Sequence, residues 1–167
     1  MTNNLITKEN LQKLTEKIKD IDIAMMTTQE KDGTLRSRPM STQEVKEDGN
    51  LWFFTEHDSA KSHEIENDSH VNLSYAKPDD NLYVSVSGKA TLSRDREKIK
   101  ELWTPPMKAW FPDGPEDDKI GLIKVSIEQA EYWDSPNSAV VHLIGMAKAV
   151  ITGQSYEPGE NEKLNLK

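Results

Sequence analysis

The sequence predicts a mainly β fold of the α+β type, in which about six antiparallel strands form a barrel or a strongly curled sheet with helices at its periphery. Short segments rich in β-branched, aromatic and Met residues follow one another between residues 23 and 133, and turn signals separate them. Helical patterns are inserted between these segments. Neither GxGxxG nor a phosphate-binding GxxxxGKS or GxxxxGKT motif occurs, which agrees with an antiparallel rather than a doubly wound fold.

The first element is predicted to be an amphipathic helix that begins at Thr7, whose hydroxyl can cap the helix N-terminus. Leu11, Leu14, Ile18 and Ile21 recur at spacings of three and four residues, with charged residues between them. One face of this helix is therefore expected to pack on the sheet.

The next elements are predicted to be an antiparallel meander. Strands are expected at residues 23–28, 35–45, 51–55, 71–76 and 82–92, with turns at residues 31–33, 48–50 and 78–80. A short helix is expected from Ser59 to about Asn67, between the third and fourth strands.

The C-terminal part is predicted to begin with an amphipathic helix and a Pro-rich loop, and to end with a helix before Gly153. The ranges are 94–103 for the first helix, 104–119 for the loop, 120–127 and 130–133 for two strands, and 140–150 for the last helix. Trp110 and Phe111 stand in the loop, which suggests a lid or an interface element. We expect residues 1–153 to form a single domain and the polar tail, residues 154–167, to be loose.

The composition excludes several classes of partner and chemistry. Lys plus Arg total 21 and Asp plus Glu total 29, so the net charge is −8 and neither nucleic acid nor an anionic membrane surface is an expected partner. The absence of cysteine excludes disulfides, thiolate nucleophiles and iron–sulfur clusters. The N-terminal MTNNLITKEN has no signal-peptide pattern and no apolar segment approaches the ~20 residues of a membrane span, so a soluble cytoplasmic protein is expected.

The segment LWFFTEHDSAKSHEI, residues 51–65, carries a candidate anion site. A helix that begins near Ser59 presents free backbone N–H groups, and the hydroxyls of Thr55 and Ser59 with the ammonium of Lys61 could complete a cradle for a phosphate monoester. The same residues also fit a simple capped helix in which Lys61 is solvated.

A second candidate segment is Arg36 to Met40, because arginines inside a strand are costly unless they are solvated or paired with an anion. Arg38 could reach the same phosphate from a neighbouring strand. An edge strand with outward-pointing arginines, where Pro39 would be tolerated, is the alternative.

A metal site is not expected from the histidines. His57, His63 and His70 are spaced by six and seven residues, before, within and after one short helix, so they need not converge.

Several of these motifs together resemble one known family. SRPM at residues 37–40, WFFTEHDSAKSHEI at residues 52–65 and AEYWD at residues 130–134 resemble the pyridoxamine-phosphate-oxidase-related flavoproteins, and most closely their bacterial general stress protein branch. WTPPMKAWFPDGP at residues 103–115 and VVHLIGMAKAVITG at residues 140–153 extend the resemblance over nearly the whole chain.

The resemblance implies a homodimer of six-stranded split β-barrels that holds FMN at the subunit interface, with two sites per dimer. It assigns these residues to the cofactor: Arg38 with the backbone of Pro39 and Met40 on one side of the flavin, Phe53, Phe54 and Thr55 beneath it, Ser59 and Lys61 on the phosphate, Trp133 from the other subunit, and Trp103 or Trp110 over the outer face.

The chain also departs from the oxidases themselves. Those enzymes have Arg-Lys after the serine of the phosphate motif, where this chain has Ala60-Lys61, and the lysine after their first arginine appears as Gln43 or is absent. Their Arg-x-His signature after the C-terminal tryptophan is replaced by a run that begins with Asp134. A substrate phosphate would lack charged partners, so oxidation of pyridoxine phosphate is not expected.

The function that follows is an FMN-dependent oxidoreductase or reductase linked to the stress response, with a small-molecule electron donor or substrate. The sequence predicts no catalytic side chain. Two alternatives stay open: a flavin-binding stress or sensor protein without turnover, and a split barrel that holds another planar cofactor such as FAD, a deazaflavin or haem.

Overall fold

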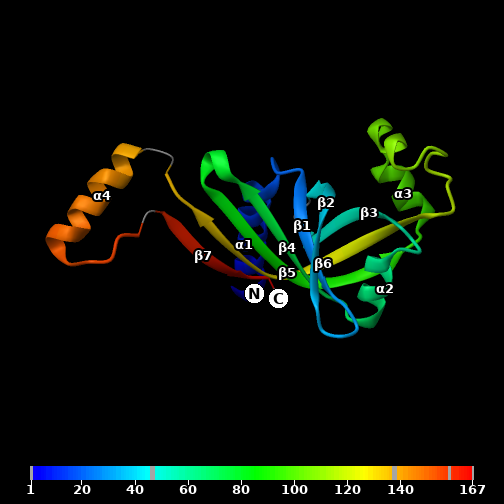
Figure 1. Cartoon of the computed structure of the whole chain (residues 1–167), viewed down its shortest axis with the longest axis horizontal. Helices are drawn as coiled ribbons and strands as arrows, with labels where there is room; N and C mark the ends of the chain where they lie inside the picture. Colours follow the sequence, from blue (N-terminus) through cyan, green and yellow to red (C-terminus); the bar gives the residue numbers. More distant parts are fainter. Residues whose placement is uncertain (1, 46–47, 137–138, 158, 167) are drawn as a thin grey trace.

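A closed barrel of antiparallel strands forms the centre of the structure (Figure 1). The computed structural model describes residues 2–45, 48–136, 139–157 and 159–166. The helices are α1 (Thr2–Ile18), α2 (Ala60–Asn67), α3 (Arg96–Leu102) and α4 (Ala139–Thr152), with short 3-10 helices at Pro78–Asp80 and Pro105–Ala109. The strands are β1 (Ile23–Gln29), β2 (Leu35–Val45), β3 (Asn50–Glu56), β4 (His70–Lys77), β5 (Leu82–Ser93), β6 (Ile120–Asp134) and β7 (Glu160–Asn165).

Six strands close the barrel in the order β3-β2-β1-β4-β5-β6, and the pairing of β3 with β6 completes the ring. All the strand pairs are antiparallel. The prediction of a mainly β barrel with about six antiparallel strands and peripheral helices is therefore confirmed. The alternative of an edge position for β2 is excluded, because β2 lies between β1 and β3.

Strand β6 has two partners on one side. Its first half pairs with β3, from Ile120 opposite Glu56 to Ser126 opposite Asn50, and its second half pairs with β7. The two strands predicted at 120–127 and 130–133 are thus one strand. The register against β5 shifts at Glu128, between Ile127, which lies opposite Gly88, and Gln129, which lies opposite Ser87. A Cβ at Gly88 would lie 2.3 Å from the carbonyl oxygen of Ser126, so only glycine allows this close approach.

The barrel interior is the main hydrophobic core, built from the inward-facing residues of alternating strand positions. Leu14 and Ile18 of α1 pack against it, as the amphipathic pattern predicted. The helix begins at Thr2 rather than at Thr7, because no Pro or Gly in the preceding segment stops it. Ile21 lies beyond the helix but is buried in the same core.

A second, smaller cluster lies beneath α3 and the loop that follows it. Its buried members are Ile99, Leu102, Phe111, Ile120 and Leu122, and the half-buried side chains of Trp52, Phe54 and Trp103 pack against them. The loop therefore covers the outer side of β3 and β6, while Trp110 beside Phe111 stays exposed.

The C-terminal segment adds β7 to the second half of β6. Leu164 and Leu166 are buried in the main core, and Glu162 accepts a hydrogen bond from the Tyr132 hydroxyl and pairs with Lys13 at 3.1 Å. The prediction that residues 154–167 form a loose tail is wrong for residues 160–166. Two leucines among polar residues are too weak a pattern to identify a strand from sequence.

Helix α4 connects β6 to β7 and stands away from the barrel at the left of Figure 1. Leu143, Ile144, Val150 and Ile151 on this helix are exposed. None of the helices among the described residues is both long enough and apolar enough to cross a membrane.

The role of β7 predicts a stability difference between two adjacent residues. Leu164 is 1% exposed, so Leu164→Ala should lower the free energy of unfolding by about 2–5 kcal/mol in urea denaturation. Lys163→Ala, on the exposed side of the same strand, should change it by less than about 0.5 kcal/mol. Equal effects of the two substitutions would show that β7 does not pack on the barrel in solution.

Candidate functional site

The junction between β3 and α2 gathers three hydroxyl groups. Ser59 caps α2, and its side chain accepts a hydrogen bond from the backbone N–H of Ser62. The Ser59 hydroxyl lies 3.3 Å from that of Thr55 and 2.9 Å from that of Ser62. Thr55 and Ser62 are both buried, so the predicted capped helix is present and its first turn is lined with polar groups inside the protein.

Arg38 approaches this junction from β2. Its Nη2 donates to a carboxylate oxygen of Glu64 on α2 at 2.8 Å, and its Nη1 donates to the Thr28 hydroxyl at 2.6 Å. The Thr28 hydroxyl donates to the same oxygen of Glu64. The side chains of Arg38 and Glu64 are only 17% and 11% exposed, so Arg38 is held inside a polar network. Arg36 instead lies on the surface, 3.5 Å from Glu30.

The charges at the junction influence one another. Burial lowers the pKa of Lys61, and the positive charge of Arg38 lowers it further, whereas Glu56 and Glu64 oppose the shift. For Glu64, burial alone would raise the pKa, but the hydrogen bonds from Thr28 and Arg38 and the charge of Arg38 bring it below its ordinary value. Arg38 and Lys61 are therefore close enough for their charges to interact, and their joint action on a phosphate stays a prediction.

Two of the predicted site residues cannot present their side chains to a ligand on the surface. Phe53 and Met40 are buried in the main core, so only their backbones are available. Phe54 packs outside the barrel, with its ring centroid 6.1 Å from that of Trp103 and 6.3 Å from that of Phe111. Pro39 is exposed on the outer face of the barrel, opposite Met25 of β1.

The two remaining predicted residues are exposed tryptophans. Trp110 is 75% exposed in the loop after α3, and no aromatic contact of its ring is found among the described residues. Trp133 is 41% exposed near the end of β6, opposite Tyr83 of β5. Gly121 of β6 pairs with Thr55, and the twelve residues from there to Trp133 span about 40 Å at roughly 3.3 Å per residue. Trp133 therefore cannot reach the junction of its own chain.

The histidines do not come together. His63 contacts Asp58 and His70 contacts Asp68, each at 2.7 Å. Within the described part of the chain, no group of three or more His, Asp or Glu side chains is arranged to hold a metal ion. The ring nitrogen Nδ1 of His57 is buried beside the junction without a hydrogen-bond partner in the described structure.

Sequence reasoning missed Thr28, Ser62 and Glu64, which complete the polar network. Thr28 carried a weak signal, because it continues the inward-facing positions of Ala24 and Met26 on β1. No local pattern identifies Glu64 as the partner of an arginine 26 residues away.

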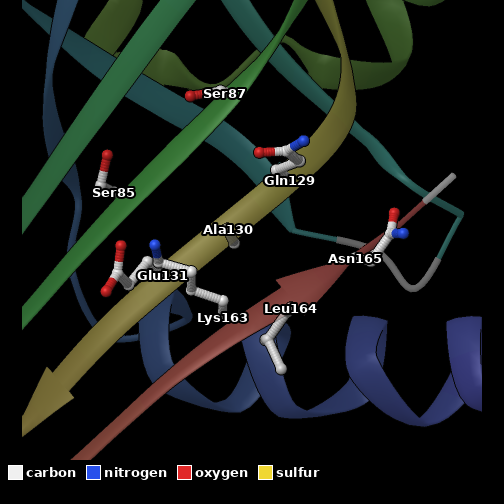
Figure 2. A pocket seen from close by; sticks show the side chains of 8 residues that line it. All are labelled: Ser85, Ser87, Gln129, Ala130, Glu131, Lys163, Leu164 and Asn165. Atoms are coloured by element: carbon white, nitrogen blue, oxygen red, sulfur yellow. The ribbon is translucent and has the colours of Figure 1, made fainter.

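Two hollows lie on the barrel surface, and one of them is lined in part by Thr28 of the polar network. One of about 360 Å³ crosses β5, β6 and β7, and Figure 2 shows its polar side chains, including Ser85, Gln129 and Glu131. The other, of about 400 Å³, is lined by residues that include Thr27 and Asn72, and the two hollows share Ser87. None of the predicted site residues lines either hollow.

Comparison with known proteins places the chain among related barrels. The family model described as pyridoxamine 5'-phosphate oxidase like matches residues 9–157. Protein bli-3 of Neurospora crassa is 34% identical over an alignment of 158 positions, and the match covers 84% of this chain and 76% of that protein.

Solved structures with the same fold include general stress proteins. A chain from Jannaschia sp. CCS1 that carries the name general stress protein 26 superposes with a TM-score of 0.72 and 23% identity over 92% of this chain and 96% of that one. A protein of Xanthomonas citri, described as a general stress FMN/FAD binding protein, gives a TM-score of 0.66 and 26% identity over 79% of this chain and 92% of that one.

Proposed function

The chain belongs to the pyridoxamine 5'-phosphate oxidase-like family, and on this premise we propose that it binds FMN and uses it as an oxidoreductase of the stress response. The observation that carries the proposal is the cluster at the β3–α2 junction, where Arg38 and Lys61 lie with buried hydroxyls at the start of a helix.

The chemistry of the junction fits a phosphate monoester. The backbone N–H groups of the first turn of α2, the Ser59 hydroxyl and the ammonium of Lys61 are donors that favour a dianion. The buried Nδ1 of His57 is an orphaned polar atom of the kind that a ligand or an ordered water satisfies. The description of the Xanthomonas citri protein as FMN/FAD binding supports a flavin, and a single phosphate cluster favours FMN within that class.

We further propose that two copies of the chain assemble each site. Trp133 and Tyr83 form an exposed aromatic pair about 40 Å along the strand from the junction, so a second copy would have to bring this pair to the flavin. Ile23 and Met25 on the outer face of β1 and the apolar side chains of α4 are exposed in the single chain. Exposed apolar surface of this kind favours an interface, and a two-fold arrangement would give two equal sites.

The flavin itself would supply the hydride or electron transfer. The chain's own residues would bind its phosphate, fix its orientation and exclude water, so no acid or base in the protein is required. Oxidation of pyridoxine phosphate is not proposed, because the oxidases' Arg-x-His after the C-terminal tryptophan is absent. Asp134 follows Trp133 in this chain, and its carboxylate is 2.5 Å from the Lys17 ammonium.

A reductase and a non-catalytic flavin carrier differ in how the flavin responds to reductants. If the chain is a reductase, anaerobic mixing of the FMN-loaded protein with NADH or NADPH should bleach the visible flavin absorbance much faster than the same donor bleaches free FMN. Oxidised flavin that persists with a panel of nicotinamide and other donors would favour the non-catalytic alternative. A colourless protein that fails to take up FMN would contradict both.

The role of Lys61 predicts a difference between two ligands. Lys61→Ala should weaken FMN binding by about 10–100-fold, because it removes a charge-assisted hydrogen bond to phosphate, and should change riboflavin binding by less than about threefold. Lys89→Ala removes the same charge from an exposed position of β5 and is the control. Flavin fluorescence quenching measures both affinities, and equal losses for the two ligands in Lys61→Ala would refute the phosphate assignment.

The shared site predicts complementation between two inactive variants. Lys61→Ala and Trp133→Ala homodimers should each hold little FMN. A mixed dimer, co-expressed and purified through two different tags, should hold about one FMN per two chains, because one of its sites combines intact Lys61 and intact Trp133. If both residues acted within the same chain, every site of the mixed dimer would be defective and it would hold no more FMN than its parents.

A further inference from the structure

Glu64 is a carboxylate held in a fixed position at the junction, where its charge opposes the binding of an anion. Its carboxylate accepts from Arg38 at 2.8 Å and from the Thr28 hydroxyl, and it is carried on α2, whose first turn forms the candidate phosphate cradle. Thr28 is buried, so the network is held from the barrel side as well as from the helix side.

We propose that Glu64 is a specificity-determining residue, which limits the affinity of the site for a phosphate dianion by holding Arg38 in an ion pair. This inference rests on the proposed flavin function. It concerns the balance between FMN and riboflavin, which carry the same ring and differ in the phosphate.

The charge balance at the junction supports the proposal. The cations Arg38 and Lys61 share the region with two carboxylates, Glu56 and Glu64, and the charge of Arg36 also acts on Glu64, so the carboxylates offset much of the positive charge. A phosphate dianion binds tightly where cations are free to pair with it. Because Arg38 is already paired, Lys61 and the helix N-terminus would supply most of the attraction.

The geometry indicates that Glu64 affects phosphate binding indirectly, through its ion pair with Arg38. Two of the five guanidinium donors are used, one on Thr28 and one on Glu64, so the remaining donors can still face a ligand. Glu64 therefore orients the guanidinium and at the same time neutralises it. Removal of the charge, with the shape kept, should strengthen phosphate binding and weaken the fold, because Arg38 loses its charged partner at a site that is only 17% exposed.

The test compares Glu64→Gln with Glu66→Gln, which makes the same change on the same helix at a side chain that is 61% exposed. Fluorescence titration should show FMN bound about tenfold more tightly by Glu64→Gln and riboflavin bound within about twofold of the wild-type affinity. Glu66→Gln should change both affinities by less than about twofold. The melting temperature of the flavin-free Glu64→Gln protein should be lower than that of the wild type.

A double-mutant cycle separates action through Arg38 from a direct effect. In an Arg38→Gln background, Glu64→Gln should leave FMN affinity nearly unchanged. The guanidinium that Glu64→Gln would free from its ion pair is absent in that background. An equal gain in that background would overturn the positioning role. If Glu64→Gln does not fold, Glu64→Asp keeps the charge and withdraws it by one methylene, and FMN should then bind more tightly than to the wild type.

Two other results would distinguish a failure of the Glu64 proposal from a failure of the proposed flavin function. Weaker or unchanged FMN binding by Glu64→Gln, in a wild-type protein that binds FMN, would show that Glu64 is purely structural and would leave the proposed function standing. A wild-type protein that binds neither FMN nor riboflavin would overturn the proposed function and this inference with it.

Discussion

The shared pairing of β6 is the constraint on which the rest of the structure depends. The strand pairs with β5 on one side along most of its length, while on the other side β3 takes its first half and β7 its second. The β3 pairing closes the barrel and places Glu56, and with it the start of α2, opposite Ile120. A slip of one residue would turn the inward side chains of β6 outward, so the buried face fixes this register.

The polar network at the β3–α2 junction shows how the barrel tolerates charge near its interior. Arg38 occupies an inward-facing position of β2, next to Met26 in the β1 register, where an unpaired cation would be strongly unfavourable. Thr28 and Glu64 satisfy it, which secures α2 against the end of the barrel. On the proposal that a phosphate binds here, the same pairing would reduce the positive field that it meets, so stability and anion affinity would oppose each other at Arg38.

The sequence predicted the strands β1 to β5 and the helices α2, α3 and α4 well, because turn signals and alternating apolar residues are local properties. Elements whose existence depends on distant partners were missed: β7 is a strand because Leu164 fits the core beside β6, and β6 continues past Glu128 because Gly88 permits a bulge. At the site, Thr55, Ser59 and Lys61 could be grouped from one segment. The pairing of Arg38 with Glu64 joins different elements, and no local rule predicts it.

The length of β6 also separates the two halves of the candidate site. Thr55 is fixed near one end of the strand and Trp133 near the other, and a rigid paired strand cannot fold back to bring them together. On the proposed arrangement, a flavin that contacts both must bridge two chains, and its binding free energy then also stabilises the dimer. The exposed apolar residues of α4 lie just beyond Trp133 in the chain, so a partner that receives this tryptophan would meet the helix as well. Cofactor binding and assembly would thus be linked through one end of β6.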